Sequence, residues 1–95
     1  MGKIIGIYKI TSPVGNIYIG LSIDIYKRFQ GYQKMRCKSQ KKLYDSLFEH
    51  GVENHTFEII HECECKHLGF FEIHYIDLFK TFNTKHGMNL TSGGR

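Results

Sequence analysis

Two short runs rich in β-branched and aromatic residues open the chain and constrain its fold more than any other feature. They cover residues 4–10 and 16–21, and residues 12–15 between them read Ser-Pro-Val-Gly. Such runs predict β-strands, and the Pro and Gly between them are typical of a turn. The chain is therefore expected to begin with an antiparallel hairpin.

The expected hairpin places two tyrosines side by side. Because side chains alternate between the faces of a strand, a turn centred on Pro13 would pair Tyr8 with Tyr18. The same turn would pair Gly6 with Gly20, and a glycine within a strand often marks close approach of a ligand or another backbone. Taken alone, the tyrosine pair is more simply interpreted as cross-strand packing.

Two helices are expected after the hairpin. The first covers residues 24–32, with Asp24 as its N-cap. The second begins near the N-cap Ser39 and ends at Gly51. It carries an apolar stripe formed by Leu43, Tyr44, Leu47 and Phe48.

A third strand over residues 56–61, a long helix over residues 68–82 and a turn-rich tail over residues 87–95 complete the chain. The order is β-β-α-α-β-α. It predicts an α+β fold, with a small three-stranded antiparallel sheet flanked by helices. A length of 95 residues suits one domain spanning residues 1–95.

One carboxylate lies among apolar residues on the long helix. Leu68, Phe71, Tyr75, Ile76 and Phe79 follow helical spacing and form one stripe, and Glu72 lies within it. A buried carboxylate must be paired, hydrogen-bonded or bound to a metal ion. Either a structural ion pair with Arg28 or a metal site would bring Arg28 and Glu72 towards the same pocket.

The positive charge of the chain is concentrated in one segment. Its basic residues are Lys27, Arg28, Lys34, Arg36, Lys38, Lys41 and Lys42, with no acidic residue among them. Tyrosines and a phenylalanine interleave with these charges. Segregated basic charge with aromatic residues favours a nucleic-acid partner over a solvated face.

The two glycine–tyrosine triplets resemble the signature of the GIY-YIG nuclease superfamily. Gly6-Ile7-Tyr8 and Tyr18-Ile19-Gly20 stand in full at the usual spacing. Ser22, Arg28, Glu72 and Asn89 follow in the family's order and rough spacing. The resemblance extends over residues 3–94, and the ending Asn-Leu-Thr-Ser-Gly-Gly is most similar to homing-type and phage-type members.

The resemblance implies a metal-dependent DNA endonuclease domain of homing or restriction type, and repair enzymes use such domains too. Glu72 would hold one divalent ion, Mg²⁺ or Mn²⁺. Tyr8 would be the general base, Tyr18 would orient water or phosphate, and Arg28 would bind the scissile phosphate. The implied catalytic residues are Tyr8, Tyr18, Arg28, Tyr32, Glu72 and Asn89, and the candidate DNA-binding residues are Lys27, Lys34, Arg36, Lys38, Lys41 and Lys42.

Two positions depart from the family pattern, and they leave the identity of the base open. Tyr32 stands where many members carry histidine, although a phenol can still donate to phosphate or relay a proton. Lys38 lies near a position that is often histidine in homing-type members. A phenol is a base near neutral pH only if a nearby cation lowers its pKa from about 10.

Two other functions remain open, and they predict different behaviour. One is a catalytically inactive nucleic-acid-binding module, which binds DNA without nicking it. The other is a small partner-binding protein with a basic face, which does neither. A double-strand break would require a dimer or two sequential nicks, and a fused DNA-binding domain would supply sequence specificity.

Cysteine content and hydropathy bear on the setting of the protein. Cys37, Cys63 and Cys65 are an odd number, and no apolar run reaches the roughly 20 residues of a membrane span. These features favour an intracellular protein without membrane association, cytoplasmic or in a host cytoplasm if viral. The spacing of Cys63, Cys65 and His67 is too tight for a usual zinc knuckle.

Overall fold

Three antiparallel strands form one sheet with the central strand contributed by the first of them. In the computed structural model, which describes residues 2–94, the order is β2-β1-β3. The strands are β1 (Gly6–Thr11), β2 (Ile17–Ser22) and β3 (Thr56–Glu62). The predicted domain and tail also include residues 1 and 95, which lie outside the described residues.

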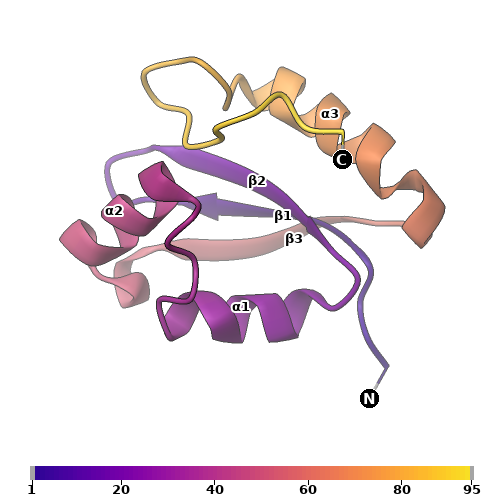
Figure 1. Cartoon of the computed structure of the whole chain (residues 1–95), viewed down its shortest axis with the longest axis horizontal. Helices are drawn as coiled ribbons and strands as arrows, with labels where there is room; N and C mark the ends of the chain where they lie inside the picture. Colours follow the sequence, from indigo (N-terminus) through magenta and orange to yellow (C-terminus); the bar gives the residue numbers. More distant parts are fainter. Residues whose placement is uncertain (1, 95) are drawn as a thin grey trace.

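Helices cover both faces of this sheet (Figure 1). One face carries α1 and α2, and α3 lies across the other, nearest to β2. The helices are α1 (Ile25–Gln33), α2 (Lys41–His50) and α3 (Leu68–Phe79), with short 3-10 turns at Val52–Asn54 and Cys65–His67. The predicted α+β class and the order β-β-α-α-β-α are confirmed.

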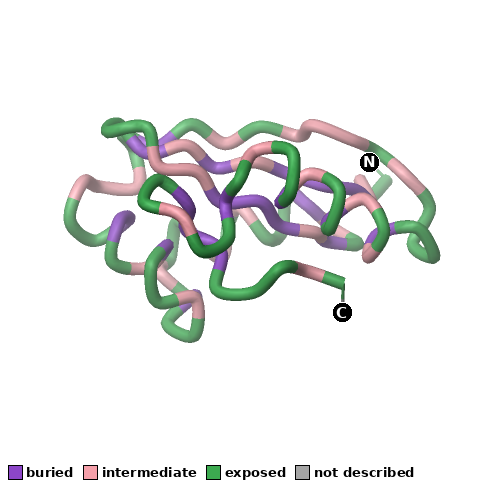
Figure 2. Tube along the Cα trace, turned by 90° about the horizontal axis from the view of Figure 1, so that it is seen from above, coloured by how far each residue is buried: buried purple, intermediate pink, exposed green. Residues whose placement is uncertain are grey.

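Each face of the sheet has its own apolar core. Tyr8, Ile10 and Tyr18 pack against residues of α1 and α2, whereas Ile7 and Ile19 pack against α3. Figure 2 shows buried stretches in the middle of the molecule and exposed ones along its loops and the outer sides of its helices. The alternation of side chains along β1 and β2 therefore divides the hairpin between two cores. In the described part of the chain, no helix is long and apolar enough to cross a membrane.

The hairpin register differs from the predicted one. Tyr8 is paired with Gly20, and Tyr18 is paired with Ile10. The connection is longer than a turn centred on Pro13, because residues 12–16 all lie in it and Ser12 N–H donates to the Asn16 carbonyl at 2.8 Å. The predicted pairing of Tyr8 with Tyr18 is therefore wrong by two residues.

The observed helix ends agree with the predicted ones at the start of α1 but differ at the start of α2 and the end of α3. Asp24 caps α1 as predicted, with its carboxylate accepting from Lys27 N–H. In α2 the cap position is Gln40 instead of Ser39. Phe48, predicted to belong to the apolar stripe, is exposed, whereas Ser46 is buried. The third helix ends at Phe79, three residues earlier than predicted.

That early end has a local cause. Lys80 adopts a left-handed backbone conformation with φ 54°. Thr81 and Phe82 then leave the helix to pair with Asn89, through the Thr81 carbonyl and an isolated parallel bridge. Pairing with the C-terminal segment therefore replaces the last helical turn.

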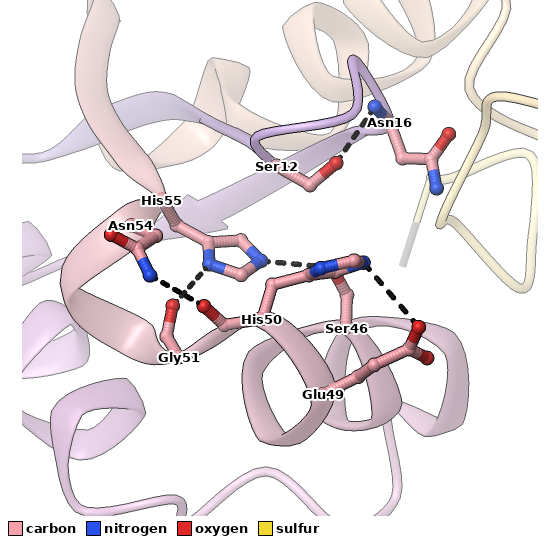
Figure 3. Close-up of polar contacts among 8 residues, drawn as sticks. All are labelled: Ser12, Asn16, Ser46, Glu49, His50, Gly51, Asn54 and His55. Carbon is pink, nitrogen blue, oxygen red and sulfur yellow. Dashed lines mark hydrogen bonds and ion pairs between the residues drawn. The ribbon is translucent and has the colours of Figure 1, made fainter.

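A buried histidine fastens α2 to the following turn (Figure 3). One ring nitrogen of His55 lies 2.8 Å from Ser46 Oγ, and the other lies 2.8 Å from the Gly51 carbonyl. Since a carbonyl only accepts, Nδ1 carries the proton and Nε2 accepts from the serine hydroxyl. His55 thus serves as a C-terminal cap of α2, and this arrangement is structural.

Candidate active site

Three tyrosine hydroxyls meet on the α1 side of the sheet. The hydroxyls of Tyr8 on β1 and Tyr32 on α1 share a short hydrogen bond. The ring of Tyr18 on β2 lies 6.2 Å from that of Tyr8 and 6.5 Å from that of Tyr32. The side chain of Tyr32 is also hydrogen-bonded to Tyr18 and Gln40. The tyrosines of both triplets therefore belong to one hydroxyl network.

Gly20 makes this arrangement possible. A Cβ added there would lie 2.3 Å from the ring and hydroxyl of Tyr8. The glycine predicted to allow close approach of a ligand or another backbone instead allows the Tyr8 ring to lie across β2. The Tyr18-Ile19-Gly20 triplet therefore contributes both a phenol, at Tyr18, and the space for the Tyr8 ring, at Gly20.

Burial affects the acidity of two of these phenols. Tyr8 and Tyr32 are each 1% exposed. Desolvation raises the pKa of Tyr8 well above 10.0, and Tyr32 and Tyr18 raise it further. Desolvation likewise raises the pKa of Tyr32 above 10.0, although its hydrogen bond with Tyr8 and the charge of Arg28 oppose that shift. The lowered pKa that a general base would require is therefore not produced in the free protein.

These shifts predict an alkaline loss of stability. Both phenols bind their protons more tightly in the folded than in the unfolded state, where the pKa is 10.0. Their contribution is complete below that pH and is lost as the pH rises through the folded-state pKa. We expect the free energy of unfolding to fall above about pH 10 by up to ~1.4 kcal/mol per pH unit for each phenol.

Urea denaturation at several alkaline pH values measures this dependence. Tyr26, an exposed phenol on α1, provides the control. The double variant with Tyr8→Phe and Tyr32→Phe should show a shallower decline than wild type, and Tyr26→Phe should show the same decline. An equal decline of stability with pH in all three proteins would mean that burial does not raise the pKa of Tyr8 and Tyr32.

A cavity of about 320 Å³ opens beside the outer edge of β2. Its lining comes from both sides of the sheet, because Tyr18 and Arg28 belong to the α1 side and Glu72 belongs to α3. The full lining is Tyr18, Arg28, Ser39, Gln40, Glu72, Asn89, Leu90 and Thr91. Residues distant in the sequence thus place a phenol, a guanidinium and a carboxylate around one space, as predicted for Arg28 and Glu72.

The carboxylate of Glu72 is buried in the way that its sequence position predicts. It is 3% exposed. One of its oxygens, Oε1, accepts a hydrogen bond from Gly94 N–H at 3.2 Å. Gly93 also lies beside this carboxylate, since a Cβ added there would be 3.2 Å from the same oxygen. The C-terminal segment therefore fixes one carboxylate oxygen.

Asn89 fastens the C-terminal segment to β2. Its Oδ1 accepts from Ile19 N–H and its Nδ2 donates to the Ile19 carbonyl, both at 2.8 Å. The amide thus replaces a neighbouring strand along the outer edge of the sheet. Asn89 also lines the cavity.

The predicted DNA-binding residues separate into two groups. Lys27, Lys34 and Arg36 line a second cavity of about 520 Å³, together with Arg28 and Lys3. Asp24 also lines it, but its carboxylate caps α1. Because Arg28 lines both cavities, the basic cavity adjoins the one that contains Glu72.

The other predicted basic residues have different surroundings. Lys38 is exposed between α1 and α2. Lys41 forms an exposed ion pair with Asp45 at 2.7 Å, and Lys42 lines a cavity with Asp45 and Glu49. The structure therefore brings Lys27, Lys34 and Arg36 towards Arg28, and it places Lys41 and Lys42 near acidic residues.

Sequence reasoning missed several residues that line these cavities. Gln40 donates from Nε2 to the Tyr18 hydroxyl at 2.8 Å. Lys3 and Gly94 also enter the two sites from the chain ends. No local pattern marks Gln40 or Gly94, because each of these two hydrogen bonds joins residues 22 positions apart in the sequence.

Comparison with known proteins agrees with this arrangement. The profile of the family described as GIY-YIG catalytic domain matches residues 4–86. The chain belongs to the GIY-YIG family. The match includes the phenols, Arg28 and Glu72, whereas Asn89 lies beyond it. A search of curated proteins finds no match.

A solved structure shows the same fold. This GIY-YIG domain is similar to the catalytic domain of intron endonuclease I-TevI, solved as a glutamate-to-alanine mutant. The TM-score is 0.77 at 25% identity, and the alignment covers 95% of this chain and 96% of that one. The sequence-based family and fold assignments are therefore confirmed.

Proposed function

We propose that this chain is a DNA endonuclease domain that hydrolyses phosphodiester bonds with the help of a divalent metal ion. The observation that carries the proposal is the cavity in which Tyr18, Arg28 and Glu72 meet, within a GIY-YIG fold. A polyanionic substrate suits the basic cavity beside it.

The residues of the cavity fit Mg²⁺ or Mn²⁺ better than zinc. In residues 2–94, no group of three His, Cys, Asp or Glu side chains could hold a metal ion. Mg²⁺ is usually held by one or two carboxylates together with waters and substrate phosphate. Glu72 would supply that carboxylate, whose Oε1 accepts a hydrogen bond from Gly94 N–H. When bound, the ion would neutralise charge on the phosphate and the leaving oxygen.

Protein side chains would bind the phosphate, orient the reacting groups and accept the proton of the attacking water. Water attacks phosphorus, the bond from phosphorus to the leaving oxygen breaks, and the water proton must pass to a base. Arg28 would hold the scissile phosphate and offset the charge that develops on it. Tyr18, which lines the cavity, would orient the water or a phosphate oxygen.

Tyr8 would act as the base through the other phenols. Its hydroxyl is buried against Tyr32, so protons would pass to it along the network that connects Tyr32 with Tyr18. Burial raises the pKa of Tyr8, and the positive charge of Arg28 lowers it. The base therefore depends on cationic charge in the assembled complex to favour its phenolate form.

The likeness to an intron endonuclease domain supports a homing-type rather than a restriction-type enzyme. One cavity of this kind would cut one strand. A double-strand break would therefore require a dimer or two successive nicks, and a fused DNA-binding domain would supply sequence specificity.

A plasmid-nicking assay tests this function. The purified protein is incubated with supercoiled plasmid and Mg²⁺, Mn²⁺ or a chelator. Nicked circles that form only with a divalent ion support the proposal. Retarded migration of DNA without nicking would favour the inactive nucleic-acid-binding module, and no interaction would favour a partner-binding protein.

DNA binding should be weak, salt-dependent and largely independent of sequence. Phosphate contacts carry no base information. If the four basic residues Lys27, Arg28, Lys34 and Arg36 reach phosphates, log K should fall with log[salt] at a slope near about −3.6. Binding to unrelated duplexes at several salt concentrations measures the slope, with Ca²⁺ in place of Mg²⁺ to limit cleavage.

Two multiple variants show which basic residues carry the effect. Alanine at Lys27, Lys34 and Arg36 should flatten the slope to about −0.9, equally for every duplex. Alanine at Lys41 and Lys42 is the matched control and should change it less, since acidic residues adjoin both. Tight binding of one sequence with little salt dependence would mean that this domain reads bases directly.

A further inference from the structure

Gln40 occupies a helix-capping position without capping the helix. It precedes α2 as the N-cap residue, yet its side chain makes no hydrogen bond with the α2 backbone. Serine, threonine, aspartate and asparagine are preferred at this position because they satisfy an exposed N–H of the first turn. The Gln40 amide instead donates to the Tyr18 hydroxyl at 2.8 Å.

The other end of the same amide has no partner in the described part of the chain. Gln40 Oε1 is buried and accepts no hydrogen bond. A buried acceptor without a donor costs stability, and most such atoms in native proteins are paired. Gln40 therefore weakens the fold in two ways, by leaving α2 uncapped and by burying an unpaired oxygen. Local choices that conflict with stability tend to occur at functional sites.

The surroundings of Gln40 indicate which function it serves. It lines the cavity that contains Arg28 and Glu72. It also contacts the phenol network, through Tyr18 directly and through a side-chain hydrogen bond with Tyr32. Gln40 therefore lies between the phenols and the groups that would hold phosphate and metal.

We propose that Gln40 is a positioning residue for the cleavage step, which fixes the Tyr18 hydroxyl through Nε2. The inference rests on the proposed nuclease function. An uncharged amide suits this place because it donates to a phenol oxygen without repelling the phosphate. A glutamate would lose the donor and add negative charge beside an anionic substrate.

The test compares Gln40→Met with a matched control. Methionine has a similar length and makes no comparable hydrogen bonds. Gln33→Met, at an exposed position at the end of α1, is the control. We expect Gln40→Met to lower kcat about 10- to 100-fold while KM for DNA stays within about twofold. Its melting temperature should stay close to that of wild type, because removal of the unpaired Oε1 offsets the loss of the hydrogen bond from Nε2 to Tyr18. Gln33→Met should match wild type in all three measurements.

A double-variant cycle with Tyr18→Phe adds a second readout. If Gln40 acts through Tyr18, the double variant should be little worse than the more impaired single variant, whereas independent roles would multiply. Normal kcat in Gln40→Met, or a loss of activity that follows a loss of melting temperature, would overturn the inference. Absence of cleavage by wild type would overturn the nuclease function itself, which distinguishes the two failures.

Discussion

Replacing Glu72 with glutamine is expected to abolish metal-dependent cleavage while the fold and DNA binding persist. Glutamine keeps the size of the side chain and can still accept from Gly94 N–H. It loses the negative charge that makes a carboxylate a ligand for a hard divalent ion. We expect a decrease in kcat of at least about 1,000-fold, which corresponds to about 4 kcal/mol of transition-state stabilisation.

A matched substitution on the same helix controls for general effects on α3. Asp77→Asn also removes a carboxylate, but Asp77 is exposed and pairs with Lys80. It should leave nicking unchanged. Melting temperatures and DNA affinities of both variants should remain close to those of wild type. Nicking by folded Glu72→Gln at the wild-type rate with Mg²⁺ would mean that the metal is held elsewhere or is not used.

Replacing Arg28 with lysine is expected to reduce turnover strongly even though the positive charge remains. Arginine presents a planar pair of donors that can bind a phosphate in bidentate fashion, and lysine cannot. Arg28 lines both cavities, so its guanidinium lies where the basic surface adjoins the Glu72 cavity. We expect Arg28→Lys to lower kcat by about 100-fold, with a smaller change in KM.

Lys27 provides the comparison for Arg28 because it is the neighbouring cation on α1. It lines the basic cavity and is absent from the lining of the Glu72 cavity. Lys27→Ala should therefore raise KM and leave kcat close to wild type. Steady-state kinetics on a nicked-product assay separates the two effects. Equal kcat in Arg28→Lys and wild type would show that Arg28 only attracts DNA.

The fold could be predicted from the sequence because its local signals agree. Runs of β-branched residues indicate the first two strands, and Pro13 and Gly15 indicate the turn between them. Asp24 indicates the start of α1. The register of the hairpin could not be predicted, since it depends on how residues 12–16 close the turn. A difference of two residues placed Tyr8 opposite Gly20 rather than Tyr18.

The site was predictable to a similar extent. The position of Glu72 in an apolar stripe predicted a buried carboxylate, and the triplets predicted the phenols. The Gln40–Tyr18 and Gly94–Glu72 contacts were not predictable, because each joins segments that meet only in the folded chain. Serine is preferred over glutamine as an N-cap, so the local sequence predicts Ser39 at this position rather than Gln40.

Locating a divalent ion tests the account most directly. The protein would be crystallised with Mn²⁺ and a short duplex carrying an uncleavable phosphate analogue, and the ion would be found by its anomalous scattering. The account predicts one ion in contact with the Glu72 carboxylate, with the phosphate between that ion and the Arg28 guanidinium. An ion bound away from Glu72, or a phosphate seated away from both residues, would contradict it.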